Sequence, residues 1–308
     1  MTSIEDRFAG CLLGLACGDA LGGPLEEIPN SPCTIPRPVI DMIGGGWLKL
    51  QPGQITDDTE MTLCLARSIV ACKKLDYADI AKRYVAWLDD SPIGAGKTCT
   101  TAITRIKEGI PWHEAANTEL GRNSLGNGAV MRCAPIALYA WTDDRIRAKA
   151  GYAESTITHL HHDCYLSTNV VTHIIASLLR GDDKKSAFRK CLLQDWTDLS
   201  RTLMSRYARI PTLTDADIKT SGEVKDTVES AIHCLLSTDT LETAIIKAAN
   251  AGGDADTRAA ITGAFAGAHY GASAIPSRWA DKLCERHGAP IADELKQLGS
   301  ALRDAIAI

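Results

Sequence analysis

Residues 58–74 read DTEMTLCLARSIVACKK, and their apolar side chains recur at three- and four-residue intervals. This spacing places one row of side chains on a single side of an α-helix. The row consists of Met61, Leu65, Ile69 and Cys72. Asp57 precedes it at the position where an N-cap residue belongs. The stretch therefore predicts a buried amphipathic helix.

The same helical spacing recurs through most of the chain, whereas runs of alternating polarity are scarce and only 5% of the residues are aromatic. Helices are predicted over residues 4–21, 78–88, 129–140, 164–179, 224–236, 241–250, 257–270 and 291–305. Short glycine-rich or polar connections separate them, without a long linker or a shift in composition. We expect an all-α protein whose residues 1–308 form a single compact domain of about a dozen helices. A repeat solenoid is the alternative, but no motif recurs at a fixed period.

The composition, 45% hydrophobic and 23% charged, is typical of a globular protein with a substantial core. The net charge of −5 and the absence of Lys/Arg runs argue against a nucleic-acid partner. Glu5 and Asp6 are unlike the start of a secretory signal, and we expect no apolar segment that spans a membrane. Eleven scattered cysteines, an odd number without C-x-x-C spacing, indicate reduced core thiols rather than disulfides or structural zinc. A cytoplasmic location follows.

Two short acidic clusters follow glycine-containing loops and open predicted helices: Thr56-Asp57-Asp58 and Asp254-Ala255-Asp256-Thr257. Carboxylates and hydroxyls are the hard ligands that Mg²⁺, Mn²⁺ and Ca²⁺ prefer. The alternative is that Thr56, Asp57 and Asp254 only cap helices. Capping needs one acid per helix, however, and paired carboxylates repel each other unless a cation lies between them. Together the clusters favour a metal site.

Three further segments combine glycines with polar side chains. Residues 122–132, RNSLGNGAVMR, form a glycine-rich loop before a predicted helix, where a diphosphate could bind, although such turns are common. Residues 158–163, THLHHD, hold three of the eight histidines and suit either a transition-metal site or a polar helix start. Residues 18–27, GDALGGPLEE, read alone as a helix that ends in glycines.

Taken in order, these segments resemble the ADP-ribosylglycohydrolase family from about residue 7 to about residue 283. The resemblance is carried by Gly18-Asp19-Ala20-Leu21-Gly22 with Glu26, Thr56-Asp57-Asp58-Thr59, Asn127-Gly128 with Met131-Arg132, Thr158-His159, and Gly253-Asp254-Ala255-Asp256-Thr257. Residues 42–48 and 52–61 are most similar to the family members that activate dinitrogenase reductase.

This resemblance implies a compact orthogonal helical bundle with two divalent cations, Mg²⁺ or Mn²⁺, in a central binuclear cleft. The implied metal ligands are Thr56, Asp57, Asp58, Asp254, Asp256 and Thr257, with Asp256 bridging. The implied ADP-ribose contacts are Ser124, Gly126, Asn127, Gly128, Met131 and His159. Glu26 matches an acid beside the metals, and either Glu26 or Asp57 would transfer the proton during catalysis.

The implied reaction releases ADP-ribose from a modified protein, most concretely from arginine, as in dinitrogenase reductase. Alternatives are serine-linked or small-molecule ADP-ribose conjugates, a non-catalytic ADP-ribose-binding regulator, or a two-metal phosphoesterase. Three positions depart from the similar family members: Gly94 stands where they have an aspartate, Glu223 replaces a tyrosine, and Arg258 replaces a small or neutral residue. If the missing carboxylate orients the substrate, Gly94→Asp should accelerate cleavage of arginine-linked ADP-ribose.

Overall fold

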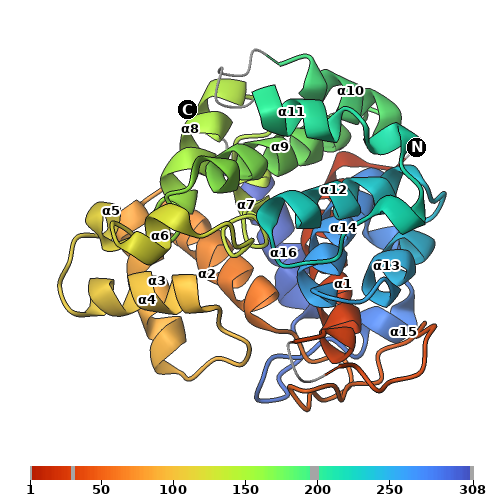
Figure 1. The fold of residues 1–308 in the computed structure, drawn as a ribbon, viewed down its shortest axis with the longest axis horizontal. Helices are drawn as coiled ribbons and strands as arrows, with labels where there is room; N and C mark the ends of the chain where they lie inside the picture. Colours follow the sequence, from red (N-terminus) through yellow and green to blue (C-terminus); the bar gives the residue numbers. More distant parts are fainter. Residues whose placement is uncertain (1, 29–31, 195–200, 306–308) are drawn as a thin grey trace.

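The computed structural model describes residues 2–28, 32–194 and 201–305. Within these ranges the chain forms sixteen α-helices and several short 3₁₀ turns, and its only β pairs are isolated bridges. Figure 1 shows the helices gathered around a central pair, α1 (Ile4–Gly22) and α14 (Ala255–Tyr270). The all-α prediction is therefore confirmed.

Glycines bring the backbones of α1 and α14 into direct contact. A Cβ atom at Gly14 would lie 2.3 Å from the carbonyl oxygen of Gly263, and a Cβ atom at Gly267 would lie 1.8 Å from that of Gly10. Gly18 and Gly22 meet the opposite helix in the same way. The predicted helix end in glycines is confirmed, because α1 ends at Gly22 with Gly23 as its C-cap, and Gly18 and Gly22 also allow the antiparallel approach of α14.

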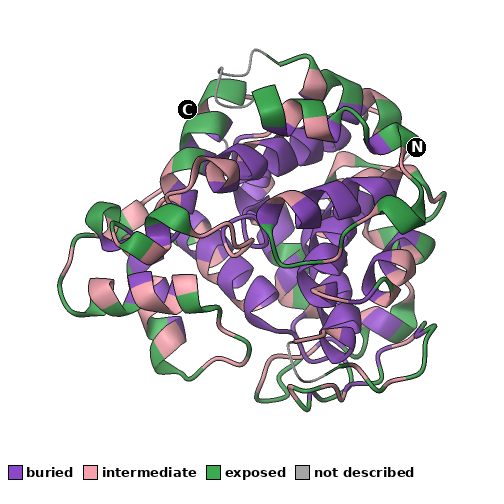
Figure 2. Ribbon diagram, in the orientation of Figure 1, coloured by how far each residue is buried: buried purple, intermediate pink, exposed green. Residues whose placement is uncertain are grey.

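The other helices pack around this pair or form a lobe at its side. They are α2 (Asp57–Cys72), α3 (Tyr77–Asp89), α4 (Lys97–Lys107), α5 (Trp112–Ala115), α6 (Glu119–Asn123), α7 (Ala134–Tyr139), α8 (Asp144–Ser155), α9 (His162–Leu179), α10 (Lys184–Leu192), α11 (Arg201–Tyr207), α12 (Val224–Leu236), α13 (Leu241–Asn250), α15 (Ser277–Ala280) and α16 (Ala292–Asp304). Figure 2 shows that α1, α14, α9 and α12 are largely buried, whereas the lobe of α3 to α6 is partly exposed.

Most predicted helices occur within two or three residues of the expected bounds, and α12 and α13 match them. The prediction for residues 129–140 was wrong at its start, because α7 begins only at Ala134, with a proline in its first turn. The N-cap of α2 is Thr56, so Asp57 is the first helical residue. Seven helices were not predicted, namely α4, α5, α6, α8, α10, α11 and α15, so the described residues form sixteen helices where about a dozen were expected. Asp143 and Asp183 cap α8 and α10 by accepting backbone N–H groups.

The expectation that no apolar segment has membrane-spanning length was wrong for one segment. Residues 4–25 are long and apolar enough by composition, but 94% of the 18-residue apolar window within them is buried inside the protein. Such burial is typical of a core helix, and α1 has its partners in α14 and α16.

Candidate active site

Acidic and glycine-rich segments from distant parts of the chain line one cleft with a volume of about 540 Å³. The predicted site residues that line it are Glu26, Asp57, Asp58, Gly126, Asn127, Gly128, Met131, His159, Asp254, Asp256 and Thr257. Thr56 and Ser124 are not among the lining residues. The cleft also includes Gly94, which precedes the lobe helix α4, and Lys97 and Cys99, which lie in its first turn.

The first acidic cluster is held by a carboxylate of α1, Asp19, whose role the sequence did not predict. Asp19 is fully buried, and its Oδ1 accepts a 2.7 Å hydrogen bond from the Thr56 hydroxyl. Its Oδ2 accepts one of 2.5 Å from the Thr59 hydroxyl. Because the Thr56 hydroxyl donates to Asp19 and makes no capping bond among the described residues, its oxygen lone pairs remain available to a cation.

The carboxylates of the cleft carry the electrostatic signature of a cation site. Burial, followed by neighbouring carboxylates, raises the pKa values of Asp57, Asp58 and Asp256 well above their ordinary range. Within the described chain, the buried Oδ1 of Asp58 has no hydrogen-bond partner. Oxygens of Glu26, Asp254 and Asp256 lie within 4.8 Å of one another. An unpartnered carboxylate oxygen in an all-oxygen donor set fits a hard divalent cation.

Two reciprocal hydrogen bonds between Glu27 and Gly253 hold the neighbouring Glu26 close to the second acidic cluster. The backbone N–H of Glu27 donates to the Gly253 carbonyl at 2.8 Å, and the N–H of Gly253 donates to Glu27 Oε2 at 2.9 Å. Gly253 has φ of +62°, and a Cβ atom there would lie 2.0 Å from the Thr220 carbonyl oxygen, so only glycine fits. Burial and Asp254 raise the pKa of Glu26 to about 7, although Trp47 donates to its Oε2 at 2.8 Å.

The loop at residues 124–128 is fixed from three sides. The Ser124 hydroxyl accepts the N–H of Gly126 at 3.2 Å, and the N–H of Val224 donates to the Leu125 carbonyl at 2.7 Å. Asn127 donates through Nδ2 to Asp254 Oδ2. Asn127 thus joins the loop to a carboxylate of the cleft, and the Ser124 hydroxyl stabilises the turn within the loop.

The imidazole of His159 lies under this loop. A Cβ atom at Gly126 would be 3.4 Å from His159 Nε2, and one at Gly128 would be 3.0 Å from its Cε1. Burial and the charge of Arg132 lower the pKa of His159 to about 3, so the ring is neutral.

The three departures from the family pattern have different surroundings. Gly94 faces the cleft with φ of +85°, and a Cβ atom there would lie 3.1 Å from Asp57 Oδ1. The Glu223 side chain is 51% exposed, lies 3.9 Å from Lys225 Nζ and does not line the cleft. Arg258 is buried and donates to the carbonyls of Ala248 and Gly252, which supports the loop before Asp254.

The histidine-rich segment after His159 lies outside the cleft lining. His161 is the N-cap of α9 and accepts the N–H of Asp163 through Nδ1 at 3.2 Å. Ligand atoms of His161, His162 and Asp163 lie within 4.8 Å of one another. The segment therefore starts a helix, as one of the two interpretations held.

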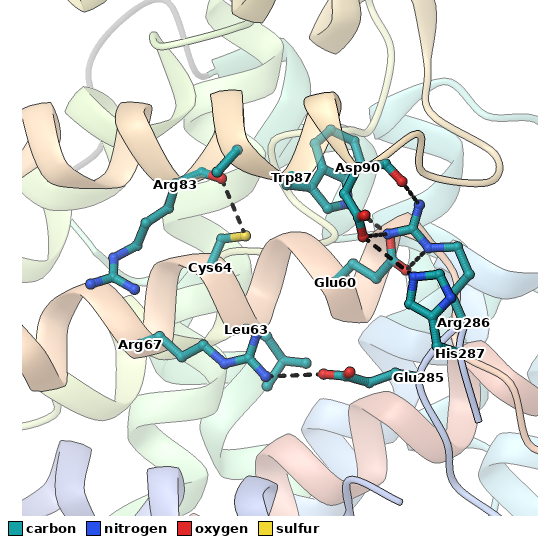
Figure 3. A pocket seen from close by; sticks show the side chains of 11 residues that line it. Glu60, Leu63, Cys64, Arg67, Arg83, Trp87, Asp90, Glu285, Arg286 and His287 are labelled. Carbon is teal, nitrogen blue, oxygen red and sulfur yellow. Dashed lines mark hydrogen bonds and ion pairs between the residues drawn. The ribbon is translucent and has the colours of Figure 1, made fainter. Parts of the chain in front are cut away.

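A second pocket of about 280 Å³ lies beside α2 and contains a guanidinium that anchors the loop leading to Gly94 (Figure 3). Arg286 donates to the Asp90 carbonyl at 2.6 Å and to Asp90 Oδ2 at 2.9 Å. Its Nε lies 3.5 Å from Glu60 Oε1, and Trp87 donates to Glu60 Oε2 at 2.7 Å. Arg286 thus links Glu60, in the first turn of α2, to Asp90, where the loop that carries Gly94 begins.

The chain is thus an all-α protein whose carboxylate-lined cleft, beside a glycine-rich loop, holds candidate ligands for a hard cation. A family model described as ADP-ribosylglycohydrolase matches residues 1–307, and the chain belongs to this family. It is an enzyme that hydrolyses ADP-ribose glycosidic bonds.

The chain is similar over most of its length to several named relatives. ADP-ribosyl-[dinitrogen reductase] glycohydrolase of Rhodospirillum rubrum is 36% identical over 91% of this chain and 91% of its own. ADP-ribosylarginine hydrolase Tri1 of Serratia proteamaculans is 35% identical over 91% of this chain and 76% of its own. A solved ADP-ribosylglycohydrolase-related protein complex superposes with a TM-score of 0.81 at 29% identity, covering 100% of both chains.

Proposed function

We propose that the chain hydrolyses the bond between ADP-ribose and an arginine side chain of a modified protein, with two divalent cations, Mg²⁺ or Mn²⁺. The observation that carries the proposal is the convergence of Glu26, both acidic clusters and the glycine-rich loop on one cleft. Relatives named for arginine and dinitrogen reductase substrates support the linkage. ADP-ribosylated dinitrogenase reductase is the most concrete target, and free ADP-ribose is the product.

In this proposal the cations are held by Thr56, Asp57, Asp58, Asp254, Asp256 and Thr257, and Glu26 lies beside them. The unpartnered Asp58 oxygen and the clustered oxygens of Glu26, Asp254 and Asp256 support this assignment. Divalent cations bound there would supply positive charge near the ribose hydroxyls and lower the pKa of water.

The protein's own groups would bind the substrate and move the proton. The loop at residues 126–128 and His159 would bind the diphosphate, with Met131 lining the cleft beside them. The bond between the anomeric carbon and the guanidine nitrogen breaks, the hydroxyl of water joins the carbon, and its proton reaches the leaving nitrogen. Glu26 and Asp57 are the two candidates for carrying this proton, and both line the cleft.

We further propose that residues 1–308 form one domain and that the protein is cytoplasmic. One hydrophobic cluster extends from Phe8 to Leu302, which supports a single domain. The ten cysteines other than Cys191 are free thiols, which supports a reducing compartment.

The test is a panel of arginine-linked, serine-linked and small-molecule ADP-ribose conjugates, each assayed with Mg²⁺, Mn²⁺ or EDTA. Cation-dependent release of ADP-ribose from the arginine conjugate supports the proposal. Preference for another linkage would favour the alternative that Gly94 motivates. Release of AMP would indicate a phosphoesterase, and binding without release would indicate a regulator.

A further inference from the structure

A buried arginine connects the core of the protein to the histidine of the cleft. Arg132 is fully buried, and its Nε donates to Glu154 Oε1 at 2.5 Å. The hydroxyl of Tyr84 donates to the same oxygen at 2.8 Å. Glu154 is equally buried, so the pair compensates its charges away from water and holds the guanidinium in one orientation.

The same guanidinium uses a second nitrogen to orient a threonine. Arg132 Nη2 donates to Thr158 Oγ1 at 2.9 Å, and Thr158 Oγ1 lies 2.8 Å from His159 Nδ1. A guanidinium can only donate, so it occupies an acceptor site of the Thr158 oxygen. The one proton of the Thr158 hydroxyl remains free to be donated elsewhere.

Two acceptors near that hydroxyl compete for its proton. Within the described chain they are His159 Nδ1 and the thiol sulfur of Cys99. Sulfur is a weak acceptor, and Cys99 Sγ already receives Arg132 Nη1 at 3.5 Å. The positive charge of Arg132 also favours a lone pair over an N–H group on the nitrogen that faces it. The Thr158 proton therefore points to His159 Nδ1.

We propose that Arg132, Glu154 and Thr158 are positioning residues that hold His159 in the neutral Nε2–H tautomer, so that it presents a hydrogen-bond donor to an anionic oxygen of ADP-ribose. The ligand part of this inference rests on the proposed function. A neutral imidazole carries one proton, and an acceptor role at Nδ1 leaves that proton on Nε2. Nε2 is the ring nitrogen beside Gly126, where the cleft is lined by backbone. The opposite tautomer would direct a lone pair at the anion.

The first test is spectroscopic and needs no substrate. The full chain is labelled with ¹⁵N-histidine, and its imidazole signals are recorded by two-bond ¹H–¹⁵N correlation at pH 6 to 8, with His159→Gln used for assignment. We expect the Nε2–H pattern for His159 over the whole pH range. An Nδ1–H pattern in the wild-type protein would overturn the proposal, whatever the variants do.

Three variants test the relay. Thr158→Val removes the hydroxyl at nearly constant volume, and we expect mixed tautomers and binding of free ADP-ribose weakened on the order of tenfold. Thr158→Ser should restore both readouts. Thr156→Val is the matched control, because the Thr156 hydroxyl donates only to the Ala153 carbonyl among described residues and should leave His159 unchanged. An unaltered His159 spectrum in Thr158→Val would also refute the relay.

The outcome separates this inference from the proposed function. An Nε2–H pattern in a protein that neither binds ADP-ribose nor releases it from any conjugate would support the relay and refute the function. An Nδ1–H pattern in an active hydrolase would refute the relay and leave the function standing.

Discussion

The hydroxyl of Thr257 donates to Oδ2 of Asp58 at 3.3 Å, although 199 residues separate the two in the chain. This contact joins the acidic start of α2 to that of α14. The glycine contacts between α1 and α14 make it possible, because they fix where α14 begins relative to Asp19 and Glu26. The convergence that the two acidic clusters predicted is therefore confirmed.

Asp256→Ala should abolish hydrolysis while the helical fold is retained. Asp256 is buried among like charges, so its removal relieves repulsion in the metal-free protein but takes away a ligand. We expect activity to fall at least about 100-fold, with an unchanged circular dichroism spectrum and a weaker thermal shift on addition of Mn²⁺. Asp239→Ala, at a fully exposed site, is the control. If the Asp256→Ala variant hydrolysed the substrate at the wild-type rate in excess Mn²⁺, the assignment of Asp256 as a metal ligand would be contradicted.

Removal of divalent cations should make stability depend on pH. Burial and neighbouring acids raise the folded-state pKa of Glu26 from 4.5 to about 7, and those of Asp57, Asp58 and Asp256 in the same direction. A carboxyl group whose pKa is raised by folding stabilises the folded protein at low pH. That stabilisation is lost as the pH rises through the pKa that the group has in the folded protein. The metal-free protein should therefore lose several degrees of Tm between about pH 5.5 and pH 8.

The measurement is the difference in Tm between EDTA-treated and Mg²⁺-saturated protein across this range. Buried neutral histidines such as His159 act in the opposite direction, but they contribute equally to both samples and cancel. The difference should widen with rising pH, because cation binding competes with protons. A difference that is constant with pH would argue against a cation among these carboxylates.

Gly14→Ala should destabilise the fold without touching the cleft. The new Cβ atom would meet the Gly263 carbonyl oxygen at 2.3 Å, and neither helix backbone can yield easily. The expected cost is about 3 kcal/mol or more, read as a lower midpoint of denaturation by urea. Gly96→Ala is the control, because a Cβ atom there meets nothing within 4 Å among the described residues. Equal midpoints for the two variants would refute the close-contact interpretation.

The sequence predicted the long helices and the acidic clusters because both are local patterns. It did not reveal why glycines such as Gly10 and Gly14 recur at four-residue intervals. Their role is to let α1 contact a partner helix about 250 positions away in the chain, and that contact cannot be seen in the local sequence. Asp19 was also left without a role, because its function is to accept hydrogen bonds from α2. Arg258 supports the loop before Asp254 by donating to the Gly252 carbonyl, a contact that the local sequence does not reveal.

Arg286→Ala should lower kcat/KM through the loop that it anchors. The substitution leaves Glu60 without its cationic neighbour and frees Asp90, from which the chain continues to Gly94 (Figure 3). We expect a decrease on the order of tenfold on the favoured conjugate. Arg83→Ala is the matched control, because Arg83 lines the same pocket but pairs with Asp79 at 2.6 Å. Equal kinetics of both variants would show that the loop does not depend on Arg286.

Gly94→Asp should fail to accelerate cleavage, in contrast to the expectation from the family pattern. The backbone at Gly94 has φ of +85°, which non-glycine residues rarely adopt, and its Cβ atom would lie 3.1 Å from Asp57 Oδ1. A second carboxylate there adds repulsion to strain, at an expected cost of about 1–2 kcal/mol in stability.

Gly96→Asp is the comparison variant for Gly94→Asp, because Gly96 also lines the cleft, has φ of −65° and caps α4 without a side-chain bond. An aspartate at position 96 should stabilise α4 by a few tenths of a kcal/mol while adding a carboxylate beside the cleft. For both variants we would measure the rate of hydrolysis of arginine-linked ADP-ribose and the midpoint of unfolding by urea. A tenfold gain in Gly94→Asp at unchanged stability would show that position 94 tolerates the carboxylate and that its absence limits the rate.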